Sequence, residues 1–245
     1  MATSTTSTER EASIGYSIFR SLVTPYWVFS AYVLGYMTVG AALGGAVTGF
    51  SFDRYILMGV ALWFGLEGLH AVDLASTTVA LRLNNRVSKI LGYTQVGIGG
   101  LIGVYLASQT SWLFLGFVGA ALFFGLAYNE EWFEGIFHDN ERLSGLLNFG
   151  FAWGIIPVLG GYFVIAETIP LAMIPIGLAV MLDAIRVILL FESGKPAPYE
   201  DLDIFYNRDY EENIEMVRSA THTSNKLGTL SWVLFAVGTM GLFVF

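Results

Sequence analysis

The segment YILMGVALWFGLEGLHAVDLASTTVA, residues 55–80, decides the fold class of this chain. Its apolar run is long enough to cross a bilayer as a helix, which takes about 20 residues. Three ionisable side chains lie inside it, namely Glu67, His70 and Asp73. Because they are three residues apart, a helix places them within roughly 120° of one another and over about 9 Å of its length. Ionisable groups are costly inside a membrane, so this face is the first place to look for function.

The composition extends this interpretation to the whole chain. Hydrophobic residues make up 55% and charged residues 13% of the 245 residues, and the mean hydropathy is +0.62. A soluble domain of this size needs more polar surface, so we predict a polytopic membrane protein. Apolar stretches of bilayer length predict an all-α bundle of about seven transmembrane helices, at Tyr26–Val47, Tyr55–Leu74, Ile90–Ala107, Trp112–Tyr128, Leu146–Ile165, Ile169–Phe191 and Leu227–Phe245.

The chain divides into a polar leader and a single membrane domain. Residues 1–25 are expected to form a cytoplasmic tail and lead-in, without the cleavage pattern of a removable signal peptide. Residues 26–245 are expected to form one transmembrane domain with a polar cytoplasmic loop at about 192–226. Pro157 is expected to bend or open the fifth span. Cysteine is absent, which excludes disulfides and thiolate metal sites.

The basic residues predict the orientation in the cell membrane. Seven spans place eleven of the 12 Lys and Arg residues on the side of the N-terminus, and only Arg54 on the other side. This asymmetry predicts a cytoplasmic N-terminus and an external C-terminus. Asp73 and the acidic segment 129–139 then both lie at the cytoplasmic face. We therefore expect the chemistry at that face and nothing catalytic outside.

The first candidate site is the face of Glu67, His70 and Asp73. A Glu-x-x-His pair presents a carboxylate and an imidazole on one side of a helix, as helical bundles do for paired iron or manganese ions. The same side chains are also typical of buried polar groups that are hydrogen-bonded between membrane helices. The pattern leaves both interpretations open.

The second candidate site follows the fourth predicted span. Glu130, Glu131, Glu134, His138 and Asp139 include pairs four residues apart, which a continuing helix would align as metal ligands. A solvated acidic helix end has the same composition. On the same predicted side, Arg82, Arg86 and Lys89 fit either a topology signal or the binding of a diphosphate.

These motifs resemble the UbiA-type membrane prenyltransferase superfamily over about residues 20–190. The closest likeness is to a poorly characterised UbiA-like subgroup with a His-x-x-Asp motif after the second helix and a Tyr-Asn…Glu…Phe-His stretch after the fourth. The matching residues here are His70, Asp73, Tyr128, Asn129, Glu131, Phe137 and His138. Asp73 alone keeps the acidic type of the superfamily's first Asp-rich motif, and the second motif has no clear counterpart.

The resemblance implies a UbiA-like bundle whose cytoplasmic-facing cavity holds an isoprenoid diphosphate through Mg²⁺. Catalytic roles would then fall to Asp73, His70 and Glu131. Substrate contacts would come from Tyr128, Asn129, Arg82 and Arg86. The candidate metal ligands, from both the residue pattern and the resemblance, are Glu67, His70, Asp73, Glu134 and His138.

Three functions remain open at this point. The first is a metal-dependent transferase that acts on an isoprenoid or other lipid substrate, with Mg²⁺ as the first choice of divalent metal. The second is a His and carboxylate site for Fe, Mn or Zn. The third is a non-catalytic subunit of a larger membrane complex, without a cofactor, that binds a lipid or quinone. All three involve membrane lipids, and none involves nucleic acid.

Overall fold

The computed structural model describes residues 14–22, 24, 26–76, 85–130, 132, 137, 143–192 and 214–244. This part of the chain is all-helical, which confirms the expected fold class. Its elements are α1 (Ile14–Leu22), α2 (Trp27–Thr48), α3 (Phe52–Ser76), α4 (Asn85–Gln109), α5 (Phe114–Asn129), α6 (Leu143–Gly150), the π-helix η1 (Phe151–Ile155), α7 (Ile156–Ala166), α8 (Met173–Glu192) and α9 (Ile214–Val244).

The predicted number of seven helices is wrong for the described residues. They form eight, because α6, η1 and α7 are continuous and count as one. The additional helix is α1, which lies in the segment expected to be a tail. At nine residues α1 is too short to cross a bilayer. A search for apolar runs of bilayer length therefore passes over it.

Polar contacts attach α1 to the start of α4. Ser17 and Ser21 are fully buried on one side of α1. The Ser21 hydroxyl lies 3.1 Å from that of Ser88, and the Gln95 amide donates to the Ser21 carbonyl over 2.6 Å. Ile14 and other apolar residues of α1 are exposed. The helix thus turns its polar side inward and its apolar side outward, as expected of a helix bordered by lipid.

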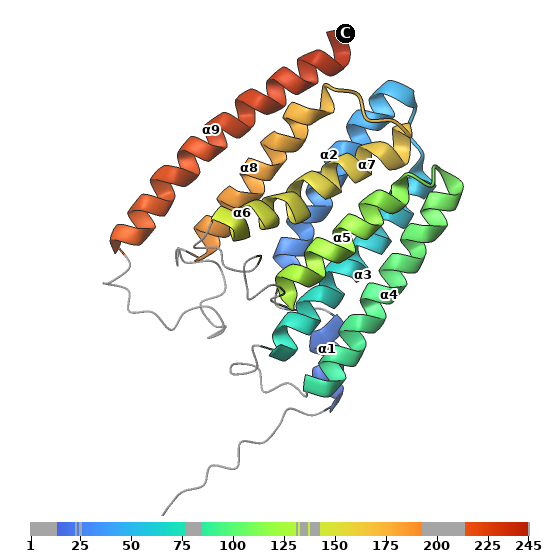
Figure 1. The fold of residues 1–245 in the computed structure, drawn as a ribbon, viewed down its shortest axis with the longest axis vertical. Coiled ribbons are helices and arrows are strands. Elements are labelled where there is room, and N and C mark those ends of the chain that lie inside the picture. Colours follow the sequence, from blue (N-terminus) through green and yellow to red (C-terminus); the bar gives the residue numbers. More distant parts are fainter. Residues whose placement is uncertain are drawn as a thin grey trace, which may run out of the picture.

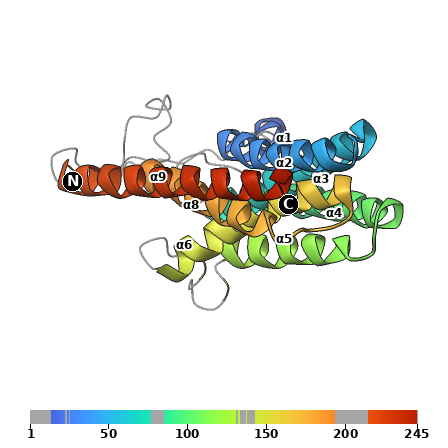
Figure 2. The same ribbon diagram turned by 90° about the horizontal axis from the view of Figure 1, so that it is seen from above.

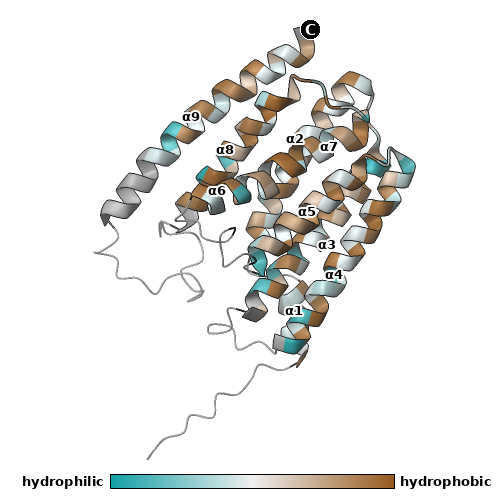
Figure 3. Ribbon diagram, in the orientation of Figure 1, coloured by the Kyte–Doolittle hydropathy of each residue, from teal (hydrophilic) through white to brown (hydrophobic). Residues whose placement is uncertain are grey.

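Five described segments are long and apolar enough to cross a membrane, namely Trp27–Thr48, Phe52–Asp73, Arg86–Gln109, Leu143–Ala166 and Thr223–Phe243. The apolar helix α5 is shorter. Consecutive helices from α2 onward run in alternate directions (Figure 1). Apolar residues cover much of their length (Figure 3). The chain therefore has the architecture of a multi-pass membrane protein.

Three helix pairs make the closest contacts in the bundle. These are α3 with α4, α2 with α7, and α8 with α9. The long helix α9 lies at one edge of the bundle in Figure 1 and packs mainly against α8, which it overlaps in the view of Figure 2. Glycine permits the α3–α4 contact, because a Cβ atom added to Gly68 would lie 2.6 Å from the carbonyl oxygen of Gly92. The two backbones touch at the level of Glu67, as small residues allow in membrane helices.

Pro157 explains the π-helix between α6 and α7, in the segment predicted as the fifth span. Proline has no N–H, so it cannot donate to the carbonyl of Trp153, four residues earlier. Just before Pro157 the helix widens, and the N–H of Ile156 bonds to the carbonyl of Phe151. The expectation that Pro157 opens this helix is confirmed in this form. The widened turn is what places the Trp153 side chain.

Candidate functional site

Glu67 is fully buried, and both of its carboxylate oxygens are hydrogen-bonded. The Thr24 backbone N–H donates to Oε2 over 2.7 Å, and the Ser30 hydroxyl donates to Oε1 over 2.6 Å. Thr24 precedes α2 and Ser30 lies in its first turns, so Glu67 joins the start of α2 to α3. This geometry favours a buried hydrogen-bonded group over a metal ligand at Glu67.

His70 lies one helical turn beyond Glu67 and is packed among aromatic rings. Its Nδ1 is 3.8 Å from Glu67 Oε1 and 3.5 Å from the Ser30 hydroxyl. Its ring stacks on Trp153 with centroids 5.3 Å apart and planes 5° apart. Tyr26 contacts the same ring at 5.0 Å. His70 is only 6% exposed, so its position is fixed by neighbours from three segments of the chain.

Asp73 completes this face of α3 and lies beside Tyr26. Burial raises the pKa of the Tyr26 phenol above its ordinary value, and the charge and hydrogen bonding of Asp73 raise it further. Tyr128 also contributes to the shift, which places it near the same pair. Asp73 is half-buried, whereas Glu67 is fully enclosed. Of the two carboxylates, Asp73 is therefore the one that a ligand at this end of the bundle can approach.

The two predicted substrate residues at the end of α5 have different surroundings. The Tyr128 ring lies 5.7 Å from Phe149 and 6.4 Å from Trp153. Asn129 is 3% exposed, and its amide donates to the Gly125 carbonyl one turn earlier. The structure thus brings Tyr128 to the aromatic cluster, while the Asn129 amide is bonded within its own helix.

The remaining predicted site residues are not joined to this cluster in the described part of the chain. Arg86 is exposed near the start of α4. The other four lie outside the described residues, and they are Arg82, Glu131, Glu134 and His138. Within the described ranges, no group of three or more His, Asp or Glu side chains is placed to hold a metal ion. A metal at Asp73 would therefore need ligands from outside the described residues, where the predicted ligands Glu134 and His138 also lie.

An apolar groove leads along α3 to this cluster. Its volume is about 90 Å³, and it lies between α3, α4, α5 and the η1–α7 segment. On α3 it extends from Met58 to Leu69, which is about 16 Å at the rise of a helix. The other lining residues include Gly100, Phe117, Leu122, Ala152, Trp153 and Ile156. The apolar lining suits a lipid tail, of which this volume would hold a part.

Three buried side-chain polar atoms lack hydrogen-bond partners among the described residues. They are the Thr24 hydroxyl oxygen, the Asn148 amide oxygen and the Trp153 indole nitrogen. A buried unsatisfied group costs about 1–3 kcal/mol. Trp153 also borders the groove. Trp153 and Ser30 were not predicted as site residues. The prediction started from ionisable side chains in apolar segments, and neither an indole nor a hydroxyl group is ionisable in that sense.

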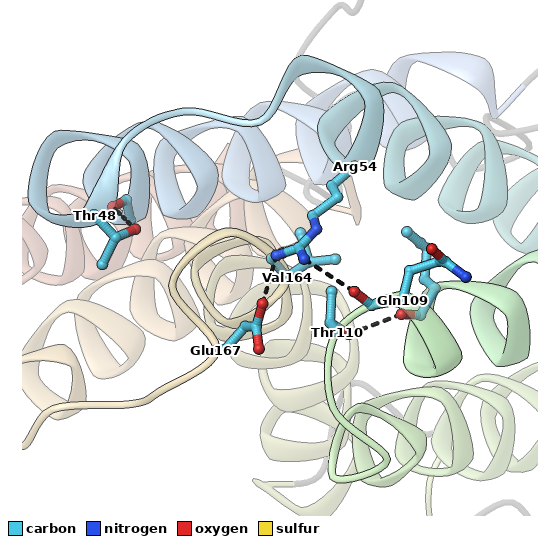
Figure 4. A network of polar contacts seen from close by, with 8 residues as sticks. Thr48, Arg54, Gln109, Thr110, Val164 and Glu167 are labelled. Carbon is cyan, nitrogen blue, oxygen red and sulfur yellow. Dashed lines mark hydrogen bonds and ion pairs between the residues drawn. The ribbon is translucent and has the colours of Figure 1, made fainter.

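The opposite end of the bundle holds a second polar group, shown in Figure 4. Arg54 donates to the Glu167 carboxylate over 2.7 Å and to the Gln109 carbonyl over 2.9 Å. It also reaches the Val164 carbonyl at 3.5 Å. Gln109 ends α4 and Val164 lies in the last turn of α7, so the arginine binds carbonyls that helix ends leave unpaired. We refer to Arg54, Gln109, Val164 and Glu167 as the Arg54 clamp.

A third polar group joins α2 to α8. The Tyr36 hydroxyl donates to Asp183 over 2.9 Å, and Arg186 donates to the other Asp183 oxygen over 2.7 Å. Both hydrogen bonds join side chains of the protein to each other. Arg186 was counted above only as a topology signal, since a sequence does not show which carboxylate an intramembrane arginine meets.

Comparisons with known proteins give no relative for this chain. No protein-family model, no curated protein and no solved structure matches it. The case for a function is therefore made from the chain's own residues, above all from the groove, the His70–Trp153 stack and the half-buried Asp73.

Proposed function

We propose that this chain is a UbiA-like multi-pass protein of the cell membrane that binds an isoprenoid or quinone-like lipid. The lipid tail occupies the groove between α3, α4 and α5, and the polar end of the lipid lies toward His70 and Asp73. One observation carries the proposal: an apolar groove about 16 Å long on α3 is bordered by Trp153, and the ring of Trp153 is stacked on His70.

The lining of the groove supports a lipid ligand. Its side chains are aliphatic or aromatic, and several positions are glycine, which leaves room between packed helices. The described residues that carry the UbiA resemblance include His70, Asp73 and Tyr128, and all three lie at the end of the bundle where α1 is found. The distribution of basic residues supports a cytoplasmic location for that end.

Filling the groove tests the proposal directly. Gly100 lines it, and a side chain there would first meet Leu122 at 3.8 Å. The variant Gly100→Leu should weaken binding of tritiated farnesol to the protein in lipid nanodiscs at least tenfold, on the order of 1.4 kcal/mol. Gly97→Leu is the matched control, since Gly97 is on the same helix, is exposed and has no neighbouring atom within 4 Å. Equal binding by both variants would exclude the groove as the tail site.

Metal-dependent prenyl transfer is the second candidate function. Asp73 favours it, because this half-buried carboxylate lies beside Tyr26 and near Tyr128 at the end of the groove. If Mg²⁺ were held by Asp73 together with the predicted ligands Glu134 or His138, it would bind a diphosphate there, and the resemblance assigns the cationic contacts to Arg82 and Arg86. In the transfer, the bond from the prenyl carbon to the diphosphate oxygen breaks. The same carbon bonds to the acceptor, which releases a proton.

Turnover separates the second candidate from binding alone. Wild-type protein in nanodiscs would be supplied with a labelled isoprenoid diphosphate, Mg²⁺ and membrane lipid extract as acceptor. Transfer that is lost in Asp73→Ala, and also lost when the metal is chelated, would support it. Binding of farnesol without any turnover would instead support the non-catalytic function, in which the chain holds a lipid or quinone within a membrane complex.

A further inference from the structure

Trp153 is the one residue of the groove lining, within the described part of the chain, whose side chain carries an N–H or O–H group. Its indole nitrogen is buried and has no partner among the described residues. The residue itself is 4% exposed. The described lining of an apolar groove thus includes a single residue with a side-chain hydrogen-bond donor, and that donor is buried and unsatisfied.

The ring of Trp153 is held in place from several sides. His70 stacks on it at 5.3 Å, Phe149 packs at 5.7 Å, and Tyr128 meets it edge-on at 6.4 Å. The residue also lies in the middle of the π-helix that precedes Pro157. Such widened turns occur often at functional sites. The indole is therefore fixed before any ligand arrives, which lowers the entropic cost of a hydrogen bond to it.

We infer that the Trp153 N–H donates a hydrogen bond to a neutral acceptor oxygen, a carbonyl, on the lipid bound in the groove. The inference rests on the proposed function and names the class of ligand, a carbonyl-bearing lipid of the quinone type. An indole N–H is a donor only, so the ligand must supply an acceptor. Among the described residues, no Lys, Arg or His side chain lines the groove, so a diphosphate at this depth would be desolvated without a cation from that lining.

A matched pair of probes and a conservative variant test this inference. Decylbenzoquinone and decylbenzene share a ring and a tail, and only the first carries carbonyl oxygens. Wild-type protein in nanodiscs should bind the quinone more tightly than the hydrocarbon. Trp153→Phe keeps an aromatic ring against His70 but removes the N–H. It should lower quinone affinity about five- to tenfold and should leave decylbenzene affinity unchanged within about twofold.

A control and a direct observation make the result specific. Trp232→Phe alters a tryptophan on α9 that is 74% exposed, and it should change neither affinity. In protein labelled with nitrogen-15 at tryptophan, one indole N–H resonance should move downfield when decylbenzoquinone is added. That resonance should be missing in Trp153→Phe.

The outcomes distinguish this inference from the proposed function. The inference is overturned if wild-type protein binds both probes equally, if Trp153→Phe weakens both to the same extent, or if the indole resonance does not move. The proposed function fails instead if neither probe nor farnesol binds in a manner sensitive to Gly100→Leu. Binding that is sensitive to Gly100→Leu but indifferent to Trp153→Phe keeps the lipid site and rejects the donor role.

Discussion

The Arg54 clamp and the surroundings of Glu67 are both polar groups in an apolar bundle, but only the clamp is complete. In the clamp, Arg54 meets a carboxylate and two helix-end carbonyls, and its ion pair remains partly open to solvent at 28% and 42% exposure. Glu67 is fully buried, and each of its carboxylate oxygens also accepts a hydrogen bond. Near Glu67 and His70, however, the Thr24 hydroxyl and the Trp153 indole lack partners among the described residues, and so does the Asn148 amide oxygen on α6.

This difference separates a structural group from a site. Buried polar atoms in folded proteins are nearly always paired, and each exception calls for an explanation. The clamp holds none of the unpaired buried atoms found among the described residues. Its role is to provide a hydrogen-bond donor for helix-end carbonyls at the end of the bundle opposite α1. Two of the three exceptions among the described residues, at Thr24 and Trp153, lie beside Glu67 and His70. A ligand with hydrogen-bonding groups would complete that end, whereas the clamp requires nothing further.

The largest effect is expected from Glu67→Ala, which removes the acceptor of two buried donors and leaves a cavity. We expect a loss of about 3–5 kcal/mol in the free energy of unfolding. Unfolding by a denaturing detergent in mixed micelles measures it. Asp53→Ala on the same helix is the control, because Asp53 is exposed in the first turn. Wild-type stability in Glu67→Ala would mean that the carboxylate is free for another role, such as a metal ligand.

A smaller effect is expected from Ser30→Ala. The variant leaves Glu67 Oε1 without its hydroxyl donor but keeps the Thr24 N–H on the other oxygen. One unsatisfied buried acceptor costs about 1–3 kcal/mol. Thr48→Ala is the matched control on the same helix, since the Thr48 hydroxyl donates to the Gly44 carbonyl one turn earlier and the residue is exposed. If both variants unfold alike, Ser30 does not stabilise the carboxylate.

Arg54→Ala should cost less than either change at the α1 end, on the order of 1 kcal/mol. Water can reach the carbonyls that the arginine leaves, because this group lies at an exposed end. Arg54→Lys should recover only part of this stability. The planar guanidinium of arginine donates to several acceptors at fixed angles, and the ammonium group of lysine does not reproduce that arrangement. A destabilisation by Arg54→Ala as large as that by Glu67→Ala would show that the polar groups at the two ends of the bundle contribute equally to stability, contrary to this expectation.

The smallest effect should come from salt. Raising the ionic strength from about 0.1 M to 1 M shortens the screening length from roughly 10 Å to 3 Å. The Arg54–Glu167 pair should lose about 0.3 kcal/mol, and the loss should vanish in Glu167→Gln. The difference in the free energy of unfolding between wild type and Glu67→Ala should not change with salt, because that carboxylate is not in contact with solvent. Salt sensitivity at Glu67 would show that the cluster is open to ions.

Part of this fold could be predicted from the sequence because hydropathy alone determines it. The predicted stretch Tyr26–Val47 matches α2, Trp27–Thr48, within one residue at each end. The segment around Pro157 was expected to open, and it holds the π-helix. The short helix α1 was missed because a bilayer-length search cannot register nine residues with a polar inner side.

The candidate site was predictable only along one helix. The three-residue spacing correctly groups Glu67, His70 and Asp73 on one side of α3, since the helical repeat fixes it. The partners of that face could not be found in this way. Trp153 is distant from His70 in the chain, and their stacking depends on where a widened helical turn places the indole. The same holds for Ser30, whose hydroxyl gains its meaning only once α2 lies against α3.

The bonds of Glu67 also bear on how the chain enters its membrane. Thr24 and Ser30, which donate to this carboxylate, precede it along the polypeptide. Synthesis proceeds from the N-terminus, so both donors have already emerged when Glu67 follows on α3. The charge therefore meets its partners as soon as α2 and α3 pair. A helical hairpin that inserts as one unit need never expose this carboxylate to lipid, and chain order itself protects the most buried charge of the bundle.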